Sequence, residues 1–470
     1  MAVDLGGTNF RVCSIQLHGN STFSLTQSKV AVPRSLMEAN TAKELFSFLA
    51  KQIEAFLKAH HNEHYQGHVR RRTTQSNEQD FKDEEIFNLG FTFSFPVHQI
   101  GINKGTLIRW TKGFDIADAI GKDVCALLQD EIDLLHLPVR VAALVNDTVG
   151  TLMARSYTSP GKTGTLLGAI FGTGTNGAYV EKLDRVTKLK SGEFGDFDKS
   201  TGEMIINTEW GSFDNDLKVL PDTQWDRELD AETPNPGIQM FEKRVSGMFL
   251  GEILRRAIIH LVKDPEVPLF SDENSGSNDI HSTTCINDNS ALFKKWGMDS
   301  SILSVAQGDK SASLMLTREF LDKDYGVYAA SAEDAEAVKV IASAIGKRAA
   351  RLAAVPIAAI VLSTGKLGKV ATTEDKEGVE PSRGSGPSDE GKKEEGVREE
   401  DVIDIGVDGS LVEFYPGFED YIREALREVP EIGEEGEKRI RIGIAKDGSG
   451  VGAALIALVA GKVAQPNEED

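Results

Sequence analysis

Cysteine is scarce in this sequence, which contains only Cys13, Cys125 and Cys285, and no two of them form a CxxC pair. A disulfide framework or a structural zinc site needs paired or clustered cysteines, so neither is expected to hold this fold together. We therefore expect a reducing compartment, in which each thiol acts as a small buried apolar group.

Positively charged residues are also scarce. The sequence contains 52 Lys and Arg residues and 73 Asp and Glu residues, which gives a net charge of −21. Proteins that bind nucleic acid neutralise its phosphates with clustered basic residues. The most conspicuous basic run, Arg70–Arg72, leads into acidic residues by Asp80 and forms no stripe. Nucleic acid is therefore not an expected partner.

Long apolar runs are missing as well. The late run Val451–Val459 is too short to cross a bilayer, and Asp4 with Gly6-Gly7 interrupts the first apolar stretch, which argues against a signal peptide. The composition is 40% hydrophobic and 27% charged over 470 residues, which is typical of a globular protein with two or three domain-sized units. We expect a soluble cytoplasmic protein without a membrane partner.

The order of apolar segments predicts an α/β protein. A β-meander is expected at the start, with strands over Met1–Leu5, Arg11–Leu17 and Thr22–Val32, followed by a helix over Thr41–His60. From Ile86 onward strand-like and helix-like stretches alternate, which indicates mixed sheets. The expected strands are residues 86–95, 139–145, 165–171, 177–183 and 357–362, and the expected helices include 116–135, 241–261 and 332–354.

Two polar segments interrupt this pattern. His60–Glu85 is aperiodic and predicts a loop, of which residues 68–85 are expected to be a disordered insertion. His61, His64 and His68 have a spacing that could suit a metal, but no carboxylates support them at fixed positions, so a solvated loop is favoured. Residues 371–401 contain eleven acidic and five basic residues, and this net charge of −6 with almost no large apolar side chain predicts a disordered surface insertion.

Three glycine-rich turns indicate phosphate binding. Asp4-Leu5-Gly6-Gly7-Thr8-Asn9 offers bare backbone N–H groups to phosphate oxygens, and Asp4 could hold Mg²⁺ directly or through a water. Phe171–Gly177 forms a second turn between strands, and Asp447–Gly450 precedes a helix whose N-terminus favours an anion or adenosine. An ordinary turn is the alternative for each alone, but three such turns in one chain favour a nucleotide.

Asp147 is the candidate general acid or base. It follows the apolar strand 139–145, at the strand end where α/β sheets collect catalytic groups. Asp is also a common helix N-cap, and the sequence gives this structural role equal weight. The neighbouring Asn146 offers a neutral amide of the kind that a sugar hydroxyl can bond.

Four short clusters mix amide, carboxylate, ammonium and hydroxyl groups with glycine or aromatic residues. They are Ser94–Pro96, Trp110–Phe114, Asn207–Gly211 and Pro236–Lys243. A neutral polyhydroxylated ligand needs donors and acceptors together, so the clusters suit such a ligand. Taken singly, each is more often a capped turn or a surface charge.

In this order the motifs resemble those of the hexokinase family. Leu5–Val12 is similar to the family's phosphate-binding loop, and Gly90–Pro96 through Trp110–Phe114 to its sugar-binding signature. Residues 146–152, the Gly-Thr-Gly loop, Glu209–Gly211, Gly237–Glu242, Gly406–Ser410 and Asp447–Gly452 follow in family order. The resemblance covers nearly the whole chain except residues 68–85 and 371–401, and Tyr415–Phe418 with Ile444–Gly452 favours a fungal-type glucokinase.

The resemblance implies an actin-like, ribonuclease-H-like fold of two α/β lobes with a ligand cleft between them. The small lobe would comprise residues 1–146 with a C-terminal helix in 447–470, and the large lobe residues 147–446. The implied activity is transfer of the γ-phosphate of ATP, bound as MgATP, to the 6-hydroxyl of glucose, the entry step of glycolysis. The implied partners are glucose and related hexoses, ATP and ADP. The preference among glucose, mannose and fructose stays open.

The resemblance also implies roles for individual residues. Asp147 matches the catalytic base, and Lys112 would be the cation nearest the reacting groups. The residues that match sugar-contacting positions are Ser94, Thr111, Lys112, Asn146, Asp147, Asn176, Glu209, Gln239 and Glu242. Those that match nucleotide-binding positions are Asp4, Leu5, Gly6, Gly7, Thr8, Asn9, Thr173, Gly247, Ser410 and Ser449, with Asp4 also the Mg²⁺ position.

One departure from the family pattern keeps alternatives open. Hexokinases carry a helical segment and a longer strand before this loop, whereas Asp4 lies near the start of this sequence. Either the sequence is truncated or the strand is shortened to about three residues, and we expect so short a strand to weaken stability and MgATP placement. A catalytically impaired, sugar-sensing homologue is one alternative, although the presence of Lys112 and Asp147 favours an enzyme. An actin-like ATPase is another, but it leaves the sugar clusters without a role.

Overall fold

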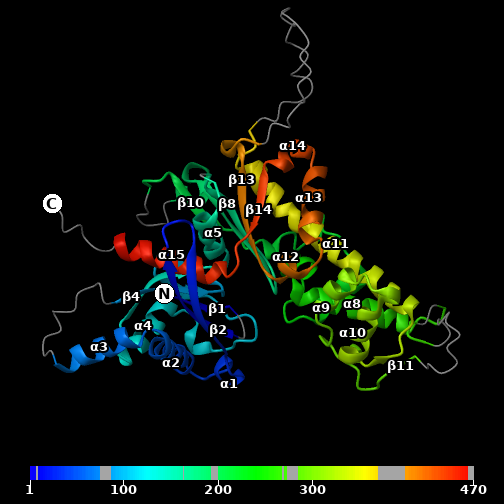
Figure 1. Cartoon of the computed structure of the whole chain (residues 1–470), viewed down its shortest axis with the longest axis horizontal. Coiled ribbons are helices and arrows are strands. Elements are labelled where there is room, and N and C mark those ends of the chain that lie inside the picture. Colours follow the sequence, from blue (N-terminus) through cyan, green and yellow to red (C-terminus); the bar gives the residue numbers. More distant parts are fainter. Residues whose placement is uncertain are drawn as a thin grey trace, which may run out of the picture. The chain divides into compact units, whose positions relative to one another are not determined.

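A computed structural model describes residues 1–6, 9–74, 86–161, 163–191, 199–266, 269–271, 284–368 and 397–463 (Figure 1). The chain divides into two units. The first comprises Met1–Gly168, Ala178–Asn207 and Gly443–Asp470, and the second comprises Ala169–Gly177 and Thr208–Ile442. The lobe boundaries expected at Asn146 and Asp447 remain a prediction.

The first unit is built on a five-stranded sheet with the order β3-β2-β1-β4-β7. Its strands are β1 (Ala2–Leu5), β2 (Asn9–Leu17), β3 (Phe23–Ala31), β4 (Phe87–Phe93) and β7 (Val139–Val145). The first three strands are antiparallel, which confirms the predicted meander, and β4 runs parallel to both β1 and β7. Although β1 has four residues, all four pair on both sides, so it forms the centre of the sheet.

The first unit also contains helices, several of which pack against this sheet. Its helices are α1 (Arg34–Met37), α2 (Ala42–His60), α3 (Asn62–Thr74), α4 (Val124–Leu134), α5 (Asp147–Thr158) and α15 (Gly448–Val463), with the 3₁₀ turns η3 (Ala117–Ala119), η4 (Leu183–Arg185) and η5 (Thr187–Ser191). Helix α2 begins as predicted, because Thr41 and Glu44 form a capping box. Its apolar stripe, which includes Leu45, Leu49 and Ile53, is fully buried. A small hairpin of β5 (Val97–Gly101) and β6 (Lys104–Leu107) follows β4.

Glycines allow α15 to approach α5 and β4 at backbone distance. A Cβ atom on Gly452 would lie 1.9 Å from the carbonyl oxygen of Gly150, and one on Gly90 would lie 2.2 Å from the carbonyl oxygen of Ala453. Any side chain at these positions would push the helix away. The C-terminal helix is therefore seated tightly on elements from the first third of the chain.

The second sheet has the order β10-β9-β8-β13-β14. Its strands are β8 (Thr165–Phe171), β9 (Thr175–Lys182), β10 (Glu203–Asn207), β13 (Ile403–Asp408) and β14 (Ile440–Ile444). Strand β8 and the β7 strand of the first sheet have the predicted bounds, because uninterrupted apolar runs are typical of strands that are buried on both faces.

The second unit is mainly helical. Its helices are α6 (Gln224–Glu232), α7 (Glu242–Val245), α8 (Gly247–Val262), α9 (Ser301–Gly308), α10 (Met315–Tyr325), α11 (Ala332–Ser363), α12 (Ser410–Phe414), α13 (Phe418–Glu428) and α14 (Gly433–Lys438). The 3₁₀ turns η6 (Trp210–Ser212), η8 (Ala291–Phe293), η9 (Ala312–Leu314) and η11 (Glu399–Asp401) and the strand pair β11 (Cys285–Ile286) and β12 (Val327–Tyr328) complete it. Figure 1 shows α11 as the longest of the labelled helices.

Two predictions of chain conformation are wrong. The expected strand 357–362 is the last part of α11, which continues through Pro356. An apolar run of this length suits a buried helix as well as a strand, so its pattern could not decide between them. The expected loop 60–85 contains helix α3, whose sequence has little apolar periodicity. Residues 75–85 lie outside the described residues.

Other elements begin or end at residues that differ from the predicted ones. The expected helix 116–135 begins only at Val124, after Asp123 caps it, and the expected helix 241–261 is broken at Ser246 into α7 and α8. The end of the predicted insertion 371–401 is ordered as η11, while residues 371–396 lie outside the described residues.

The structure shows the surroundings of the histidine and cysteine residues that the sequence analysis singled out. His61 bonds the hydroxyl of Ser14 (3.0 Å) and, like His64, packs its ring against Phe87. Across the described residues, no three His, Cys, Asp or Glu side chains form a group that could hold a metal ion. Cys13 and Cys125 are buried, and burial raises the pKa of the Cys13 thiol to about 11, but Cys285 is exposed, contrary to expectation.

As for membrane spans, the helices in the described part of the chain include none that is long and apolar enough to cross a bilayer.

A buried carboxylate provides a test of the second unit's stability. Asp309 accepts hydrogen bonds from the backbone N–H and hydroxyl of both Ser311 and Thr317, at 2.5 to 2.8 Å. Burial alone would raise its pKa, but these bonds lower the pKa of Asp309 to about 2. Its stabilising effect is therefore present at neutral pH and disappears as the pH falls from about 4 towards 2.

We expect Asp309→Asn to lower the free energy of unfolding by about 2 kcal/mol at pH 7, because a well-bonded carboxylate is lost. Urea denaturation at pH 7 and at decreasing pH measures the difference, which should shrink below pH 4. A difference that stays constant down to pH 3 would contradict the role of this carboxylate.

Candidate functional site

Asp147 and Lys112 both contact Ser94, which follows strand β4 in the first unit. The Oδ2 atom of Asp147 accepts a hydrogen bond from the hydroxyl of Ser94 (3.1 Å) at the end of β4. The ammonium group of Lys112 donates to the carbonyl oxygens of Ser94 (3.0 Å) and Gly6 (2.9 Å). The structure therefore brings the predicted base, the predicted cation and the phosphate-binding turn together.

The sequence predicts that Asp147 acts either as a catalytic group or as the cap of a helix, and the start of helix α5 shows which residue caps it. Asn146 is the N-cap, and its side-chain oxygen accepts from the backbone N–H of Thr148 (2.9 Å). Asp147 is the first helical residue and also accepts from this N–H through Oδ1, while Oδ2 points to Ser94. The capping role thus falls mainly on Asn146, which uses only its amide oxygen for it.

Asp4 is a carboxylate with an unusual environment. Its Oδ2 atom accepts a hydrogen bond from the Ser449 hydroxyl (3.0 Å), but its Oδ1 atom is buried and has no hydrogen-bond partner among the described residues. Burial raises the pKa of Asp4, and the nearby charge of Asp147 raises it further, while Arg11, Ser449 and Lys112 act in the opposite direction. This oxygen is disposed to accept a cation.

Contacts that the sequence did not reveal hold Ser449 in place. Arg11 on β2 forms an ion pair with Asp447 (2.8 Å), the residue just before α15. The Thr92 hydroxyl donates to the Ser449 carbonyl oxygen (3.3 Å). Each of these residues lies in one of the motifs described above. No local sequence pattern, however, indicates contacts between residues so far apart in the chain.

A second group of predicted residues gathers in the second unit. The amide of Asn176 donates to Glu209 (3.3 Å), and Glu242 Oε2 accepts from the backbone N–H of Thr175 (3.1 Å). The indole of Trp210 donates to the Thr175 hydroxyl (3.0 Å). We call Asn176, Glu209, Gln239 and Glu242 the hexose cluster, because these are the predicted sugar-binding residues of this unit.

Gly211 connects Gln239 to the rest of the hexose cluster. A Cβ atom on Gly211 would lie 2.5 Å from Gln239 Oε1 and 3.3 Å from Glu242 Cβ, so both side chains lie directly over this glycine. In the part of the chain that the structure describes, Gln239 Oε1 is buried without a hydrogen-bond partner. It is an acceptor that a ligand hydroxyl could satisfy.

Three of the predicted sugar-binding residues adopt a left-handed backbone conformation. The φ angles are 57° for Lys112, 50° for Glu209 and 60° for Gln239. Such angles are unfavourable for residues with a Cβ atom and persist only where surrounding contacts impose them. Other non-glycine residues of the chain also have positive φ angles, so these angles show that the three side chains are held by their surroundings rather than marking the site by themselves.

The predicted nucleotide positions of the second unit also converge. The backbone N–H of Gly247 donates to the carbonyl oxygen of Gly172 (2.8 Å), and that of Met248 donates to Thr173 (3.1 Å). A Cβ atom on Gly172 would lie 3.5 Å from the backbone nitrogen of Ser410. The turn at Thr173 therefore lies against both Gly247 and Ser410.

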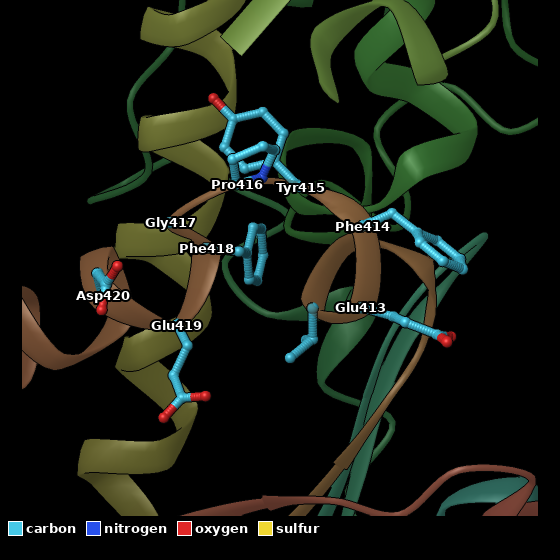
Figure 2. Close-up of a pocket in the computed structure, with 9 residues that line it drawn as sticks. Glu413, Phe414, Tyr415, Pro416, Gly417, Phe418, Glu419 and Asp420 are labelled. Atoms are coloured by element: carbon cyan, nitrogen blue, oxygen red, sulfur yellow. The ribbon is translucent and has the colours of Figure 1, made fainter. Parts of the chain in front are cut away.

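A pocket of about 540 Å³ follows Ser410 in the chain and is lined by Val412–Asp420 (Figure 2). Figure 2 shows Phe414 at the end of α12, Tyr415 in the following loop and Phe418 at the start of α13. Phe414 is 63% exposed. The pocket thus combines an exposed aromatic ring with three acidic residues in its lining, Glu413, Glu419 and Asp420.

The remaining predicted residues are less directly connected. Leu5 is buried, and its carbonyl oxygen accepts from the Ser94 backbone N–H (3.3 Å). Thr111 lies in the turn of Lys112, which the backbone N–H of Phe114 closes on the Thr111 carbonyl oxygen (3.1 Å). Asn9 is exposed at the start of β2. Gly7 and Thr8 lie outside the described residues.

Comparison with known proteins identifies the family. Two models of the family described as Hexokinase match residues 1–157 and 166–459. Glucokinase of Aspergillus niger is 60% identical over 462 residues, which cover 98% of this chain and 86% of that protein. Glucokinase-1 of Saccharomyces cerevisiae is 41% identical over 475 residues, with 98% and 84% covered.

A solved structure agrees with these relatives. The hexokinase from Schistosoma mansoni complexed with glucose superposes with a TM-score of 0.70 at 30% identity, and covers 97% of this chain and 84% of that chain. The chain therefore belongs to the hexokinase family, in its fungal-type hexokinase and glucokinase branch.

The predicted two-lobed, actin-like sugar kinase fold and the predicted kinase activity on a hexose are thereby confirmed. Neither these relatives nor the described residues favour the alternative of a catalytically impaired, sugar-sensing homologue.

The environment of Asp4 leads to a prediction about stability. Because its folded pKa is raised, the wild-type protein is stabilised by this group when it is protonated and loses that stability as the pH rises through the raised pKa. We expect Asp4→Asn to raise the ligand-free Tm at pH 7.5 by roughly 2–4 °C, which corresponds to about 1 kcal/mol.

The gain should shrink as the pH is lowered from 7.5 through the raised pKa of Asp4, because the wild-type carboxyl then becomes protonated as well. Thermal unfolding of both proteins across this range measures it. A variant that is less stable than wild type at pH 7.5 would show that Asp4 contributes to the ligand-free fold rather than awaiting a cation.

Proposed function

We propose that this chain transfers the γ-phosphoryl group of MgATP to the 6-hydroxyl of glucose, with Asp147 as the general base. The observation that carries this proposal is the convergence of Asp147, Ser94 and Lys112, a carboxylate beside a hydroxyl and a fixed ammonium group. Transfer of a phosphoryl group depends on placement and charge neutralisation more than on covalent help. These three side chains supply both.

In this proposal Asp147 removes the proton from the attacking hydroxyl. Its carboxylate is held at the start of α5 by the fixed helix N-terminus, and Ser94 orients the Oδ2 atom from the side of β4. A base works within hydrogen-bond distance of the proton that it takes, so a rigid carboxylate at this place favours a single hydroxyl of the sugar.

Lys112 would neutralise negative charge on the transferred group. Two carbonyl oxygens, of Gly6 and Ser94, anchor its ammonium group, and the third N–H remains to donate to a phosphate oxygen. The Gly6 carbonyl belongs to the phosphate-binding turn, so the same cation is tied to the turn and to the sugar-binding strand.

The hexose cluster would bind the sugar hydroxyls. Asn176 and Gln239 offer amides, and Glu209 and Glu242 offer carboxylates, so the cluster provides donors and acceptors for a neutral polyol. The buried, unpartnered Oε1 atom of Gln239 supports this assignment, because a sugar hydroxyl would satisfy it.

The nucleotide would be held by the glycine turns. In the second unit, Thr173 and Ser410 lie together at the turn that Gly247 packs against, and they carry hydroxyl groups of the kind that bind phosphates and ribose. The exposed ring of Phe414 suits the base, while the nearby carboxylates of the pocket repel a triphosphate.

Asp4 fits a magnesium ion, because its buried Oδ1 atom is a hard oxygen without a hydrogen-bond partner in the described chain. Bound there, Mg²⁺ would neutralise phosphate charge, and Asp4 would hold it directly or through a water. One carboxylate is sufficient for an ion that takes its other ligands from phosphates and water. A cytoplasmic location for this reaction remains a prediction.

The proposed function is tested by ADP production with and without glucose. We expect glucose-dependent turnover, and Asp147→Ala should lower kcat by at least about a hundredfold, the usual effect of losing a general base. Asp184→Ala, which removes an exposed carboxylate on η4, is the matched control and should leave kcat unchanged.

ADP formation that does not depend on glucose would support an ATPase and contradict the kinase. Glucose binding without turnover in the wild-type protein would support a sensor. The same assay with mannose and fructose, read as kcat/KM, measures the preference among hexoses.

A further inference from the structure

The loop that carries Gln239 lies between α6 and α7 in the second unit and runs over residues 236–241, which we call the glutamine loop. Within this loop, Gln239 is held in an unfavourable conformation. The φ angle of Gln239 is 60°, and its Oε1 atom is buried beside Gly211 with no hydrogen-bond partner among the described residues. A free loop would relax from such a conformation, so other contacts must maintain it.

The first of these contacts is a buried ion pair at the base of the glutamine loop. Lys243 Nζ donates to Asp230 Oδ1 (2.6 Å) and to the carbonyl oxygen of Asn235 (2.8 Å). The Lys243 side chain is only 2% exposed and that of Asp230 17%. Burying an ammonium group is unfavourable unless a charge and further acceptors surround it. Here one acceptor is the Asp230 carboxylate on α6, and the other is a backbone carbonyl just before the glutamine loop.

This ion pair connects to Gln239 through the backbone. Asp230 also accepts from the backbone N–H of Gly237 (3.0 Å), and the backbone N–H of Lys243 donates to the carbonyl oxygen of Gln239 (2.9 Å). Gly237 has a φ of 74°, which suits glycine, so the chain turns there before it reaches Gln239. Asp230 and Lys243 thus fix both sides of the strained residue.

A second contact acts on the neighbouring residue Met240. Its backbone N–H donates to Asn215 Oδ1 (3.2 Å), and its carbonyl oxygen accepts from Arg244 Nη1 (2.9 Å). Arg244 is itself buried and paired with Asp222 (2.9 Å). The glutamine loop is therefore held by one network based on Asp230 and another based on Asn215 and Arg244.

We propose that Lys243, with Asp230, is a positioning residue for hexose recognition: the buried pair holds Gln239 in its strained conformation, so that its amide oxygen is presented to the sugar before the sugar binds. This inference rests on the proposed function, in which Gln239 contacts the hexose. In the proposed function, Lys243 contacts neither the sugar nor the phosphates of the nucleotide. Its loss affects sugar affinity, because the ligand must then impose the loop conformation.

Lys243→Met is the primary variant. Methionine has a similar length and no charge, and the remaining carboxylate of Asp230 keeps its bond to Gly237 and is partly exposed, so the fold should tolerate the change. We expect the glucose Kd and KM to rise about tenfold with kcat within about threefold, the pattern of lost ground-state binding. The KM for MgATP should not change.

Asn215→Ala is the second variant, because it removes the other tether at a partly exposed position and leaves the buried charges intact. It should also raise the glucose Kd, by about threefold, as expected for the loss of one hydrogen bond. Asp309→Asn is the matched control. It disturbs a buried carboxylate of the same unit whose partners lie outside the glutamine loop, and it should lower stability without changing the glucose Kd.

A double-mutant cycle separates positioning from general damage. In a Gln239→Ala background, Lys243→Met should change the glucose Kd by less than about twofold, since the side chain that it positions is gone. An equal tenfold effect in both backgrounds would overturn the proposal, as would a wild-type glucose Kd in a folded Lys243→Met protein.

Failure of the proposed function has a different signature. It would appear as a wild-type protein that does not bind glucose by calorimetry or does not turn it over. Failure of the positioning role alone would leave wild-type binding and turnover intact, with Lys243→Met and Asn215→Ala indistinguishable from it.

Discussion

The backbone contact between α5 and α15 is the constraint on which the catalytic part of the first unit depends. Gly150 and Gly452 let the two helices touch without side chains between them, and a Cβ atom on Gly150 would lie 2.6 Å from the Ser449 carbonyl oxygen. Ser449 then reaches Asp4, and α5 places Asp147 at its first turn. The predicted nucleotide-binding turn at Asp4 and the predicted base Asp147 are therefore positioned by one pair of helices, although they lie far from α15 in the sequence.

Both groups of site residues contain polar atoms that the fold leaves unsatisfied. Asp4 Oδ1 and Gln239 Oε1 are buried acceptors without hydrogen-bond partners in the described residues, and Lys112, Glu209 and Gln239 have positive φ angles. Each such feature lowers the stability of the ligand-free protein. They persist because stronger local contacts impose them, which is the usual balance between stability and activity at a functional site.

Most of the site could be named from the sequence because its residues stand in short ordered motifs that resemble one family. Strands such as β7 and β8 were also predictable, since apolar runs of about seven residues between polar turns leave few alternatives. The last part of α11 was not, because an alanine-rich, β-branched run is equally compatible with a buried strand. Helix α3 lacks the apolar period that a prediction requires.

The ion pairs and hydrogen bonds between the site residues could not be predicted from the sequence, for a different reason. Nothing near Arg11 indicates Asp447 as its partner, and nothing near Asp230 indicates that it anchors Lys243 and Gly237 together. Such contacts depend on tertiary placement, since charged residues on exposed turns have the same local pattern as those in buried pairs. The motifs therefore predict which side chains meet the substrate, and the structure shows which contacts hold those side chains.

The acidity of the chain is consistent with a triphosphate ligand once the charges are considered locally. Repulsion from distant carboxylates is largely screened, because the Debye length is about 8 Å at physiological ionic strength. Close to the site the balance differs, since Lys112 and Arg11 face the pair of Asp4 and Asp147, whose mutual repulsion contributes to the raised pKa of Asp4. A nucleotide that arrives with its own divalent cation relieves that repulsion, whereas a bare triphosphate would add to it. The repulsion between these two carboxylates therefore supports the proposal that the chain binds the metal complex of the nucleotide rather than the free triphosphate.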